Sequence, residues 1–260
     1  MGERTEHTPG TFSWTDLNTT DQEAAKAFYS AMFGWQITDM PAGEGVVYSM
    51  AAIDGKWVAA ISPQPQQQRD AGAPPAWNSY ITVTDVDETA SRAAELGAAV
   101  HAPPFDVMEA GRMAVVQDPQ GAWFLLWQPR QHIGAGLVNA PGALCWNELG
   151  SPDLDGSARF YGDLLGWTTE AMDGVDPPYL VIRTADGHSN GGIRPPAPPG
   201  APPFWLAYFA TTDIEASLGQ AAELGGTVLV GSTDIGIARI GVLQDPQGAV
   251  FALYNGQLDP

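Results

Sequence analysis

Hydrophobic and polar residues follow a strand-then-helix order at the start of the chain. Residues 12–18 alternate as a short half-buried strand does, and Asp21 then stands where it can cap a helix. One face of this helix is formed by Phe28, Tyr29, Met32 and Phe33. Gly34 ends the helix where a left-handed residue is favoured, and strand-like runs follow near residues 46–53 and 58–61. The pattern predicts one strand-helix-strand-strand-strand unit.

The same order begins again after residues 62–76. This segment is rich in proline, so it is expected to cross the surface as an extended connection. A strand is predicted over residues 77–83 and a helix over residues 85–96, and two further strands meet at a turn over residues 118–121. Residues 11–130 therefore predict two βαβββ units.

Landmarks of the first half return in the second half in the same order. The hexapeptide Gln117–Ala122 is repeated unchanged as Gln244–Ala249, 127 residues later, and Trp14 returns as Trp146. Its Asp-Pro-Gln-Gly core suits a type I turn, so the hexapeptide is interpreted as a structural hairpin. A repeat of this length predicts two domains of one fold.

The fold class predicted from this repeat is α+β, with a mixed sheet and flanking helices in each half. In the second half, the strand-like runs fall at residues 179–184 and 191–193. The predicted boundaries are a flexible tail at residues 1–10, a first domain at 11–130, a linker at 131–142 and a second domain at 143–257.

Charge and composition narrow the possible partners. Acidic residues outnumber basic ones by 30 to 11, which gives a formal charge of −19 and disfavours nucleic acid and anionic membranes. No apolar run reaches the roughly 20 residues needed to cross a bilayer, and the polar N-terminus lacks a secretory signal. Cys145 is the only cysteine, which excludes an internal disulfide and a cysteine metal cluster. These features predict a soluble, cytoplasmic protein.

The order of the landmarks resembles the vicinal oxygen chelate superfamily, which includes glyoxalase I, extradiol dioxygenases and bleomycin resistance proteins. The resemblance rests on the first strand, the helix that carries Phe28-Tyr29 and ends at Gly34-Trp35, and the late Asp-Pro-Gln-Gly hairpin. It spans nearly the whole chain and implies tandem glyoxalase-like domains, each with two βαβββ units whose curved sheet forms a cup. The two-domain form is similar to tandem actinobacterial members. Because this fold hosts unrelated activities, the resemblance implies no particular reaction.

In metal-dependent members of the superfamily, His, Gln or Glu side chains on three strands hold a divalent ion at the cup floor. The corresponding positions here are Trp14 and Trp146; Asn78 and Leu206, or Tyr80 and Tyr208 in a register shifted by two; and Leu125 and Leu253. Indole and alkyl groups offer no lone pair to a hard cation, and a lone amide is a poor substitute. None of the four histidines has the spacing of a ligand pair. We therefore expect no metal ligands and no cofactor, with a displaced divalent metal site as the alternative.

Aromatic and acidic side chains stand where the metal ligands would be. By the period of two along a strand, Asp16 shares a face with Trp14, and Glu148 with Trp146. The expected lining is completed by Asn78, Tyr80, Leu125 and Trp127 in the first cup and by Leu206, Tyr208, Leu253 and Asn255 in the second. Such a lining suits a small, planar, partly apolar organic molecule. The competing interpretation is that these aromatic rings fill the cups as core.

The sequence leaves two functions open. One is metal-independent binding of a small organic molecule, for sequestration or resistance. The other is a lyase, isomerase or oxygenase-like enzyme that uses a displaced metal or a carboxylate base, for which Asp16 and Glu148 are the candidates. Arg112 and Arg239 recur at equivalent positions, where structural ion pairs with equivalent acids are expected. The duplication predicts an internal pseudo-dimer that is a monomer or a weak homodimer.

Overall fold

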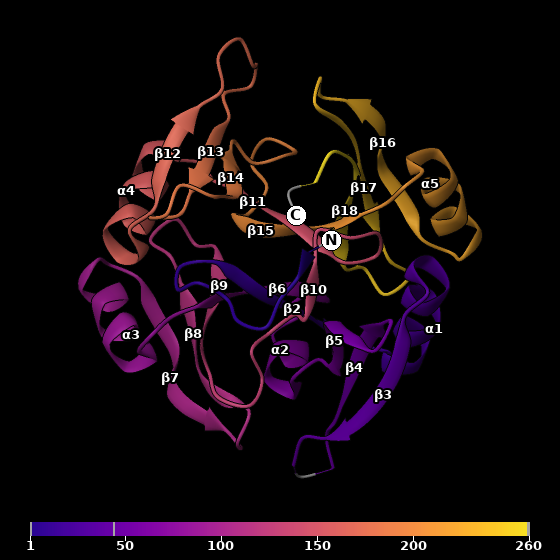
Figure 1. Cartoon of the computed structure of the whole chain (residues 1–260), viewed down its shortest axis with the longest axis horizontal. Coiled ribbons are helices and arrows are strands. Elements are labelled where there is room, and N and C mark those ends of the chain that lie inside the picture. The colour runs from indigo at the N-terminus through magenta and orange to yellow at the C-terminus, as the bar shows by residue number, and fades with distance from the viewer. Residues whose placement is uncertain (1, 44, 259–260) are drawn as a thin grey trace.

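The protein consists of two halves, each built on one eight-stranded sheet, as Figure 1 shows. The structure is a computed structural model that describes residues 2–43 and 45–258. The first sheet has the spatial order β3 (Gln36–Pro41), β4 (Val47–Ile53), β5 (Lys56–Pro63), β2 (Phe12–Thr19), β6 (Ala76–Thr82), β9 (Trp123–Pro129), β8 (Gly111–Gln117) and β7 (Ala99–Val107). The second has the order β12 (Thr168–Ala171), β13 (Leu180–Arg183), β14 (Ser189–Arg194), β11 (Leu144–Gly150), β15 (Phe204–Ala210), β18 (Val250–Gly256), β17 (Ala238–Gln244) and β16 (Thr227–Asp234).

Both sheets are mixed and have the same connectivity. In each sheet the first strands of the two units, β2 and β6 or β11 and β15, pair antiparallel. Each of these strands also pairs in parallel with the last strand of its own unit. The predicted α+β class, with two βαβββ units in each half, is therefore confirmed.

Apart from the short α2, the helices form where the sequence places caps and apolar faces. They are α1 (Gln22–Phe33), α2 (Gln66–Asp70), α3 (Val86–Glu95), α4 (Leu154–Leu165) and α5 (Ile214–Glu223). Asp21 caps α1 by accepting a hydrogen bond from the Ala24 amide, and Gly34 ends it with φ of 70°. The short helix α2 interrupts the segment that was expected to be extended. Among the described residues, no helix is long and apolar enough to cross a membrane.

The first residues of the chain are not a free tail. Strand β1 (Gly2–Glu3) pairs antiparallel with β10 (Leu137–Val138), which lies in the segment between the two sheets. His7 also hydrogen-bonds the Ala135 carbonyl through Nε2 at 2.8 Å. The prediction of a flexible tail is therefore wrong for the described part of residues 1–10, because the backbone there is paired with the interdomain segment.

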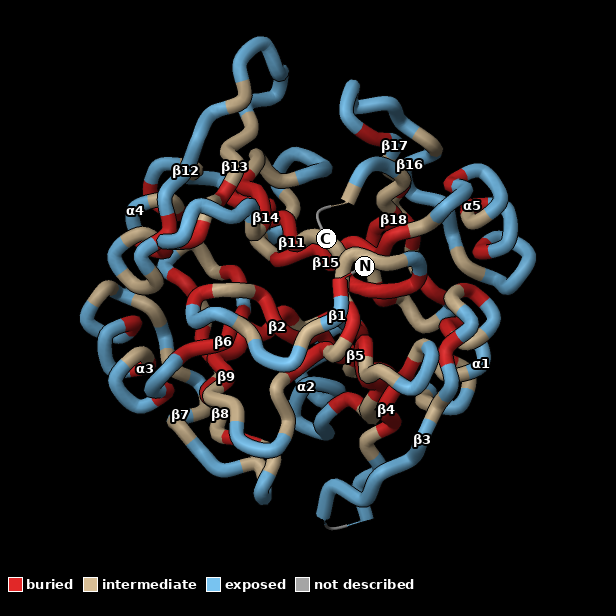
Figure 2. Tube along the Cα trace, in the orientation of Figure 1, coloured by how far each residue is buried: buried red, intermediate tan, exposed pale blue. Residues whose placement is uncertain are grey.

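Two large hydrophobic cores are each built from both halves of the chain. In Figure 1, α1 of the first half lies beside α5 of the second, and α3 lies beside α4. The core beneath α1 and α5 contains Phe28 together with Phe251 of the other half, and the core beneath α3 and α4 contains Phe124 together with Phe160. Figure 2 shows the buried residues concentrated on the central strands and the inner faces of these helices. Each of these two cores is therefore completed only when both halves are present.

The repeated hexapeptide connects the two halves as well as turning the chain. The Oδ1 atom of Asp118 accepts hydrogen bonds from the amides of Gln120, Gly121 and Ala122, which confirms a structural hairpin. Its Oδ2 atom accepts a 3.0 Å hydrogen bond from the buried Tyr161 hydroxyl of the other half. The reciprocal contact joins the Tyr29 hydroxyl to Asp245 at 2.9 Å. The tyrosine of each repeated Phe-Tyr sequence therefore hydrogen-bonds the aspartate of the Asp-Pro-Gln-Gly sequence in the other half.

Candidate functional site

The face of the first sheet turned away from the helices is called cup 1. It gathers the predicted site residues Trp14, Tyr80, Leu125 and Trp127 into one cluster, together with Met50, Ala60 and Ala135. The equivalent face of the second sheet, called cup 2, gathers Trp146, Leu206, Tyr208 and Ala252 with Phe204, Ile240, Val242, Val250 and Tyr254. Trp14 and Tyr80 therefore share cup 1, and Trp146 and Tyr208 share cup 2, in agreement with the strand alternation predicted from the sequence.

Asp16 lies at the floor of cup 1, where hydrogen bonds occupy both of its carboxylate oxygens. Its Oδ1 accepts from the Asn78 amide at 2.7 Å, and its Oδ2 accepts from the hydroxyls of Tyr80 at 2.7 Å and Tyr48 at 2.9 Å. Trp14 donates from Nε1 to the Tyr48 hydroxyl at 3.0 Å. Burial raises the pKa of Asp16, and the three hydrogen bonds oppose that rise. Asp16 is 3% exposed, so its carboxylate hydrogen-bonds within the protein and presents no acceptor to solvent.

Cup 2 repeats this arrangement with one exchange of partners. Trp146 donates from Nε1 to the Tyr179 hydroxyl at 2.9 Å, and the hydroxyls of Tyr179 and Tyr208 hydrogen-bond the Glu148 carboxylate. Leu206 stands in the place of Asn78 and offers no donor. Arg194 instead brings Nη1 to 3.6 Å from Glu148 Oε1. Burial raises the pKa of Glu148, while Arg194 acts to lower it.

Tyr48 and Tyr179 were missed in the sequence. They recur 131 residues apart, and each joins the indole of its cup to the carboxylate. Burial and the neighbouring carboxylates raise the pKa of both phenols above the usual range, so both stay protonated and donate hydrogen bonds to the carboxylates. Their recurrence near the start of a strand in each half was the signal that could have revealed them.

A segment of the interdomain connection covers cup 1. The His132 ring packs edge-on against Trp14 with 4.6 Å between ring centroids, and the His132 carbonyl accepts from Trp127 Nε1 at 3.0 Å. The Ala135 amide donates to the Ser13 carbonyl at 2.7 Å. Burial lowers the pKa of His132 to about 4, so the ring is neutral at pH 7. Residues 132–135, which we call the plug, therefore occupy the space over the floor of cup 1.

A cavity of about 380 Å³ lies outside the plug. It is bordered by the first residues of the chain, the turn before β5 and the plug itself, with Arg4, Lys56, Trp57 and His132 in its lining. Trp14, Asp16 and Tyr80 do not line it. The cavity therefore gives no access to the floor of cup 1.

Cup 2 is less enclosed than cup 1. Trp146, Tyr179, Phe204 and Tyr254 are each partly exposed, whereas Trp14, Tyr80 and Trp127 in cup 1 are buried. Glu148 itself is 8% exposed. Trp146, Glu148 and Tyr254 therefore lie closer to solvent than their counterparts Trp14, Asp16 and Trp127, whereas the tyrosines of the two networks are similarly buried.

Two predicted lining residues of cup 2 lie on the wrong face of β18. Leu253 is fully buried in the core beneath α1 and α5, and Asn255 donates from Nδ2 to the Thr211 carbonyl at 2.9 Å. Ala252 pairs with Tyr208 as Leu125 pairs with Tyr80, so Ala252 and Tyr254 are the true equivalents of Leu125 and Trp127. The prediction was one residue out of register, and a shift of one residue moves a side chain to the opposite face of a sheet.

The donor set of neither cup fits a divalent metal. Each cup offers one carboxylate, surrounded by neutral hydroxyls that donate to it, and the family ligand positions carry indole, alkyl or amide groups. A hard cation needs several unprotonated oxygen or nitrogen donors converging on one point. Within residues 2–43 and 45–258, no group of three or more His, Cys, Asp or Glu side chains is placed to hold a metal ion.

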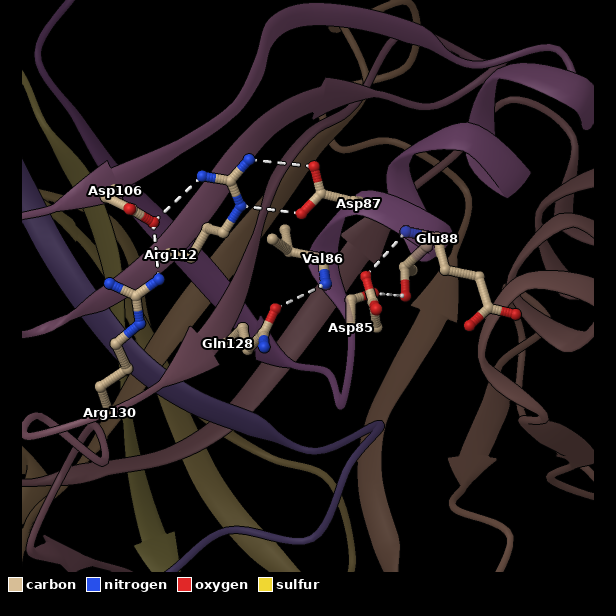
Figure 3. Close-up of polar contacts among 9 residues, drawn as sticks. Asp85, Val86, Asp87, Glu88, Asp106, Arg112, Gln128 and Arg130 are labelled. Carbon is tan, nitrogen blue, oxygen red and sulfur yellow. Dashed lines mark hydrogen bonds and ion pairs between the residues drawn. The ribbon is translucent and has the colours of Figure 1, made fainter.

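Arg112 and Arg239 form the structural ion pairs expected for them. Arg112 bridges Asp87 at the start of α3 and Asp106 on β7, with N–O distances of 2.8 and 3.0 Å (Figure 3). Arg239 reaches Glu215, the equivalent acid in α5, at 3.3 Å. These contacts tie a helix to the outer strands of each sheet and lie outside both cups.

Comparison with known proteins yields the same two-part pattern. The sequence profile of the glyoxalase/bleomycin resistance protein/dioxygenase superfamily matches residues 11–126, and a profile of the glyoxalase-like domain matches residues 145–254. CFP32 of Mycobacterium bovis, named as a proposed glyoxylase, is 44% identical over 258 residues that cover 98% of each chain. The anthracycline biosynthesis protein DauV of Streptomyces sp. strain C5 is 32% identical over 269 residues, covering 96% of this chain and 95% of its own.

Solved structures share the fold at low sequence identity. The Mn(II)-bound glyoxalase of Novosphingobium aromaticivorans superposes with a TM-score of 0.66 at 16% identity, covering 98% of this chain and 83% of its own. The 2,3-dioxygenase LapB of Pseudomonas sp. KL28 gives a TM-score of 0.64 at 16% identity, covering 98% and 95%. At this identity the likeness concerns the fold alone.

Proposed function

The chain belongs to the glyoxalase/bleomycin resistance protein/dioxygenase superfamily, and from this premise we propose that it binds a small, planar, partly apolar organic molecule in cup 2 without a metal ion. The proposed role is sequestration of, or resistance to, that molecule. The observation that carries the proposal is the difference between the cups. Cup 1 is covered by the plug, whereas Trp146 and Tyr254 of cup 2 are partly exposed.

The chemistry of cup 2 supports a planar ligand. The indole of Trp146 and the rings of Phe204 and Tyr254 offer faces for stacking, while Leu206 and Val242 supply apolar contact. Glu148 and Arg194 provide a polar end to the site. DauV is named for anthracycline biosynthesis, and a planar ligand for the present chain is compatible with that relative. The small residue Ala252, in place of Leu125 of cup 1, leaves more room on the strand beside Tyr208.

A thermal-shift screen of planar polycyclic aromatic compounds tests this proposal, with wild type compared with Trp146→Ala and the matched variant Trp14→Ala. Loss of the stacking face should weaken binding about tenfold or more in Trp146→Ala. Trp14→Ala should lower the starting melting temperature, because Trp14 is buried, yet retain the ligand-induced shift. Equal shifts in all three proteins would remove cup 2 as the site.

An enzyme of the lyase, isomerase or oxygenase-like type is the second candidate. It is favoured by one observation, which is that burial raises the pKa of Glu148, because a carboxylate with a raised pKa is a stronger base than an exposed one. The name of CFP32 points in the same direction. Asp16 is a weaker candidate, since both its oxygens are occupied and the plug covers it. Mass spectrometry of a bound compound after incubation with wild type and Glu148→Gln tests this candidate, because binding alone leaves the compound unchanged in both.

We further propose that the protein works in the cytoplasm as a monomer. The lone Cys145 is partly buried, donates to the Tyr208 carbonyl at 3.4 Å, and has its pKa raised by burial, so its thiol stays protonated and unreactive. The reciprocal Tyr–Asp contacts between the halves fill the role that a second chain plays in a symmetric dimer. Sedimentation at micromolar concentration distinguishes a monomer from a homodimer.

A further inference from the structure

Tyr179 occupies the centre of the polar network in cup 2. Its hydroxyl accepts from Trp146 Nε1 at 2.9 Å and hydrogen-bonds the Glu148 carboxylate. A group in this place must accept one hydrogen bond and donate another. The phenol of the protein itself meets both requirements.

The backbone that carries Tyr179 differs from that of its counterpart Tyr48. Tyr48 lies within β4 and pairs with Met40 of β3. Tyr179 lies just before β13 and directly after Pro177 and Pro178, which are exposed. Its carbonyl accepts a 2.9 Å hydrogen bond from the Met172 amide beside the β12–β13 ladder, so its backbone is fixed, while its side chain is held in cup 2 through the ring and the hydroxyl. The Tyr179 side chain can therefore rotate out of the network without breaking a strand pair.

Gly192 makes the position of the Tyr179 hydroxyl possible. It pairs with Glu148 in the parallel ladder, and a Cβ atom added there would overlap the Tyr179 hydroxyl. Cup 1 has Ala60 at the matching place, opposite Asp16. The hydroxyl of Tyr179 thus lies deep against the sheet over a glycine, in a space that another hydroxyl of similar size can fill.

We propose that the ligand of cup 2 carries a ring hydroxyl, and that this hydroxyl displaces Tyr179 and takes its place between Trp146 and Glu148. This inference rests on the function proposed above and specifies the chemical class of its ligand. Tyr179 then acts as an internal competitor, and the ligand enters as Tyr179 swings out. Tyr208 keeps its hydrogen bond to Glu148 in both states.

The network selects a hydroxyl over other polar groups. An ether oxygen accepts from the Trp146 N–H but cannot replace the hydrogen bond that the Tyr179 hydroxyl donates to Glu148. An ammonium donates to Glu148 and leaves the indole N–H unpaired. A carboxylate is repelled by Glu148. A site whose buried partners require both a donor and an acceptor discriminates strongly against analogues that supply one.

Competition by a tethered side chain weakens ligand binding in a measurable way. A group held close to its site acts at an effective concentration in the millimolar range. Removing the Tyr179 ring should therefore tighten binding of a hydroxylated ring about tenfold or more. In cup 1 the matched change has no such effect, because the plug covers the floor.

Calorimetric titration with 2-naphthol and 2-methoxynaphthalene tests the proposal on the full chain. The proteins are wild type, Tyr179→Ala, Gly192→Ala, Trp146→Ala and the cup 1 control Tyr48→Ala, each checked for folding by far-UV circular dichroism. Gly192→Ala places a methyl group where the Tyr179 hydroxyl lies, so it excludes the Tyr179 hydroxyl and the ligand hydroxyl alike. We expect about tenfold tighter binding of 2-naphthol in Tyr179→Ala than in wild type, and no such gain in Gly192→Ala or Tyr48→Ala. We also expect Tyr179→Ala to bind 2-methoxynaphthalene at least tenfold more weakly than it binds 2-naphthol.

The possible failures of this experiment have different meanings. If Tyr179→Ala binds both probes equally, if Gly192→Ala gains affinity for 2-naphthol as Tyr179→Ala does, or if Tyr179→Ala weakens 2-naphthol binding as Trp146→Ala does, the displacement is refuted while cup 2 remains a planar binding site. If neither probe binds any of the five proteins, and a wider set of planar compounds gives no thermal shift, the proposed function itself fails together with its ligand class.

Discussion

Replacing Tyr161 by phenylalanine removes one hydroxyl at the contact between the two halves. Tyr161 is fully buried, accepts from Trp205 Nε1 at 2.9 Å and donates to Asp118 Oδ2 at 3.0 Å. The ring and its apolar contacts remain in Tyr161→Phe. The variant therefore isolates two hydrogen bonds: the one to Asp118, which ties α4 to the hexapeptide of the other half, and the one from Trp205, which lies within the second half.

The expected loss follows from the groups that are left behind. A hydrogen bond to a charged group contributes about 1.5–3 kcal/mol, and a buried donor left unpaired costs about 1–3 kcal/mol. Asp118 keeps its three backbone donors, so we take the lower ends and expect Tyr161→Phe to lose about 2–4 kcal/mol in the free energy of unfolding. Tyr29→Phe should lose a similar amount, because Tyr29 accepts from Trp77 and donates to Asp245 in the same way.

Urea unfolding followed by tryptophan fluorescence and far-UV circular dichroism measures this loss. Both probes should report one transition, since each hydrophobic core draws on both halves. Tyr254→Phe is the control, because its partly exposed hydroxyl makes a 3.3 Å contact near the end of the chain, and the change should be within about 0.5 kcal/mol. A loss below about 1 kcal/mol in both buried variants, or two separate transitions in wild type, would refute the reasoning.

Three further outcomes follow from the structure. Burial lowers the pKa of His132 to about 4, so between pH 6.5 and 4 the unfolded chain binds a proton that the folded chain does not. The free energy of unfolding should therefore decrease as the pH is lowered through that window. Urea midpoints should show a smaller decrease in His132→Leu than in the control His188→Asn. Arg112→Ala should leave the urea midpoint nearly unchanged in the same assay, because its partners Asp87 and Asp106 are exposed, and a shift as large as that of Tyr161→Phe would contradict the assignment as a surface ion pair. Dialysis against EDTA should leave the melting temperature unchanged, whereas a drop of several degrees would reveal a metal site that the donor sets of the cups do not explain.

The sequence allowed the fold and much of the cup lining to be predicted, because both depend on local periodicity. Alternation along the first strand places Trp14 beside Asp16 and Trp146 beside Glu148, and the structure brings each pair into contact with the same network. Leu253 was misplaced by one residue, because the hexapeptide repeats at an offset of 127, which makes Ala252 the equivalent of Leu125; an error of one residue reverses the face of a strand.

The closure of cup 1 could not be predicted in the same way. His132 lies in a connection without periodicity, and its contact with Trp14 depends on the path of the chain between the sheets. The hydrogen bond between Tyr161 and Asp118 could not be predicted either, because a local motif already accounted for each residue: an apolar helix face for Tyr161 and a turn for Asp118. Long-range pairs between irregular segments leave no pattern in a single sequence, whereas strands and helices do.

The sharing of each core between the halves has a consequence for synthesis of the chain. Translation delivers α1 and α3 long before β18, yet the core beneath α1 is completed by residues of β18 and α5. The first half therefore leaves the ribosome with part of the apolar surface of its helices and sheet uncovered, so it cannot fold and detach as a finished domain in the usual order. Folding has to wait until nearly the whole described chain has emerged, so premature termination after residue 130 should yield an aggregation-prone fragment, while two separately expressed halves should rescue each other when they are made together.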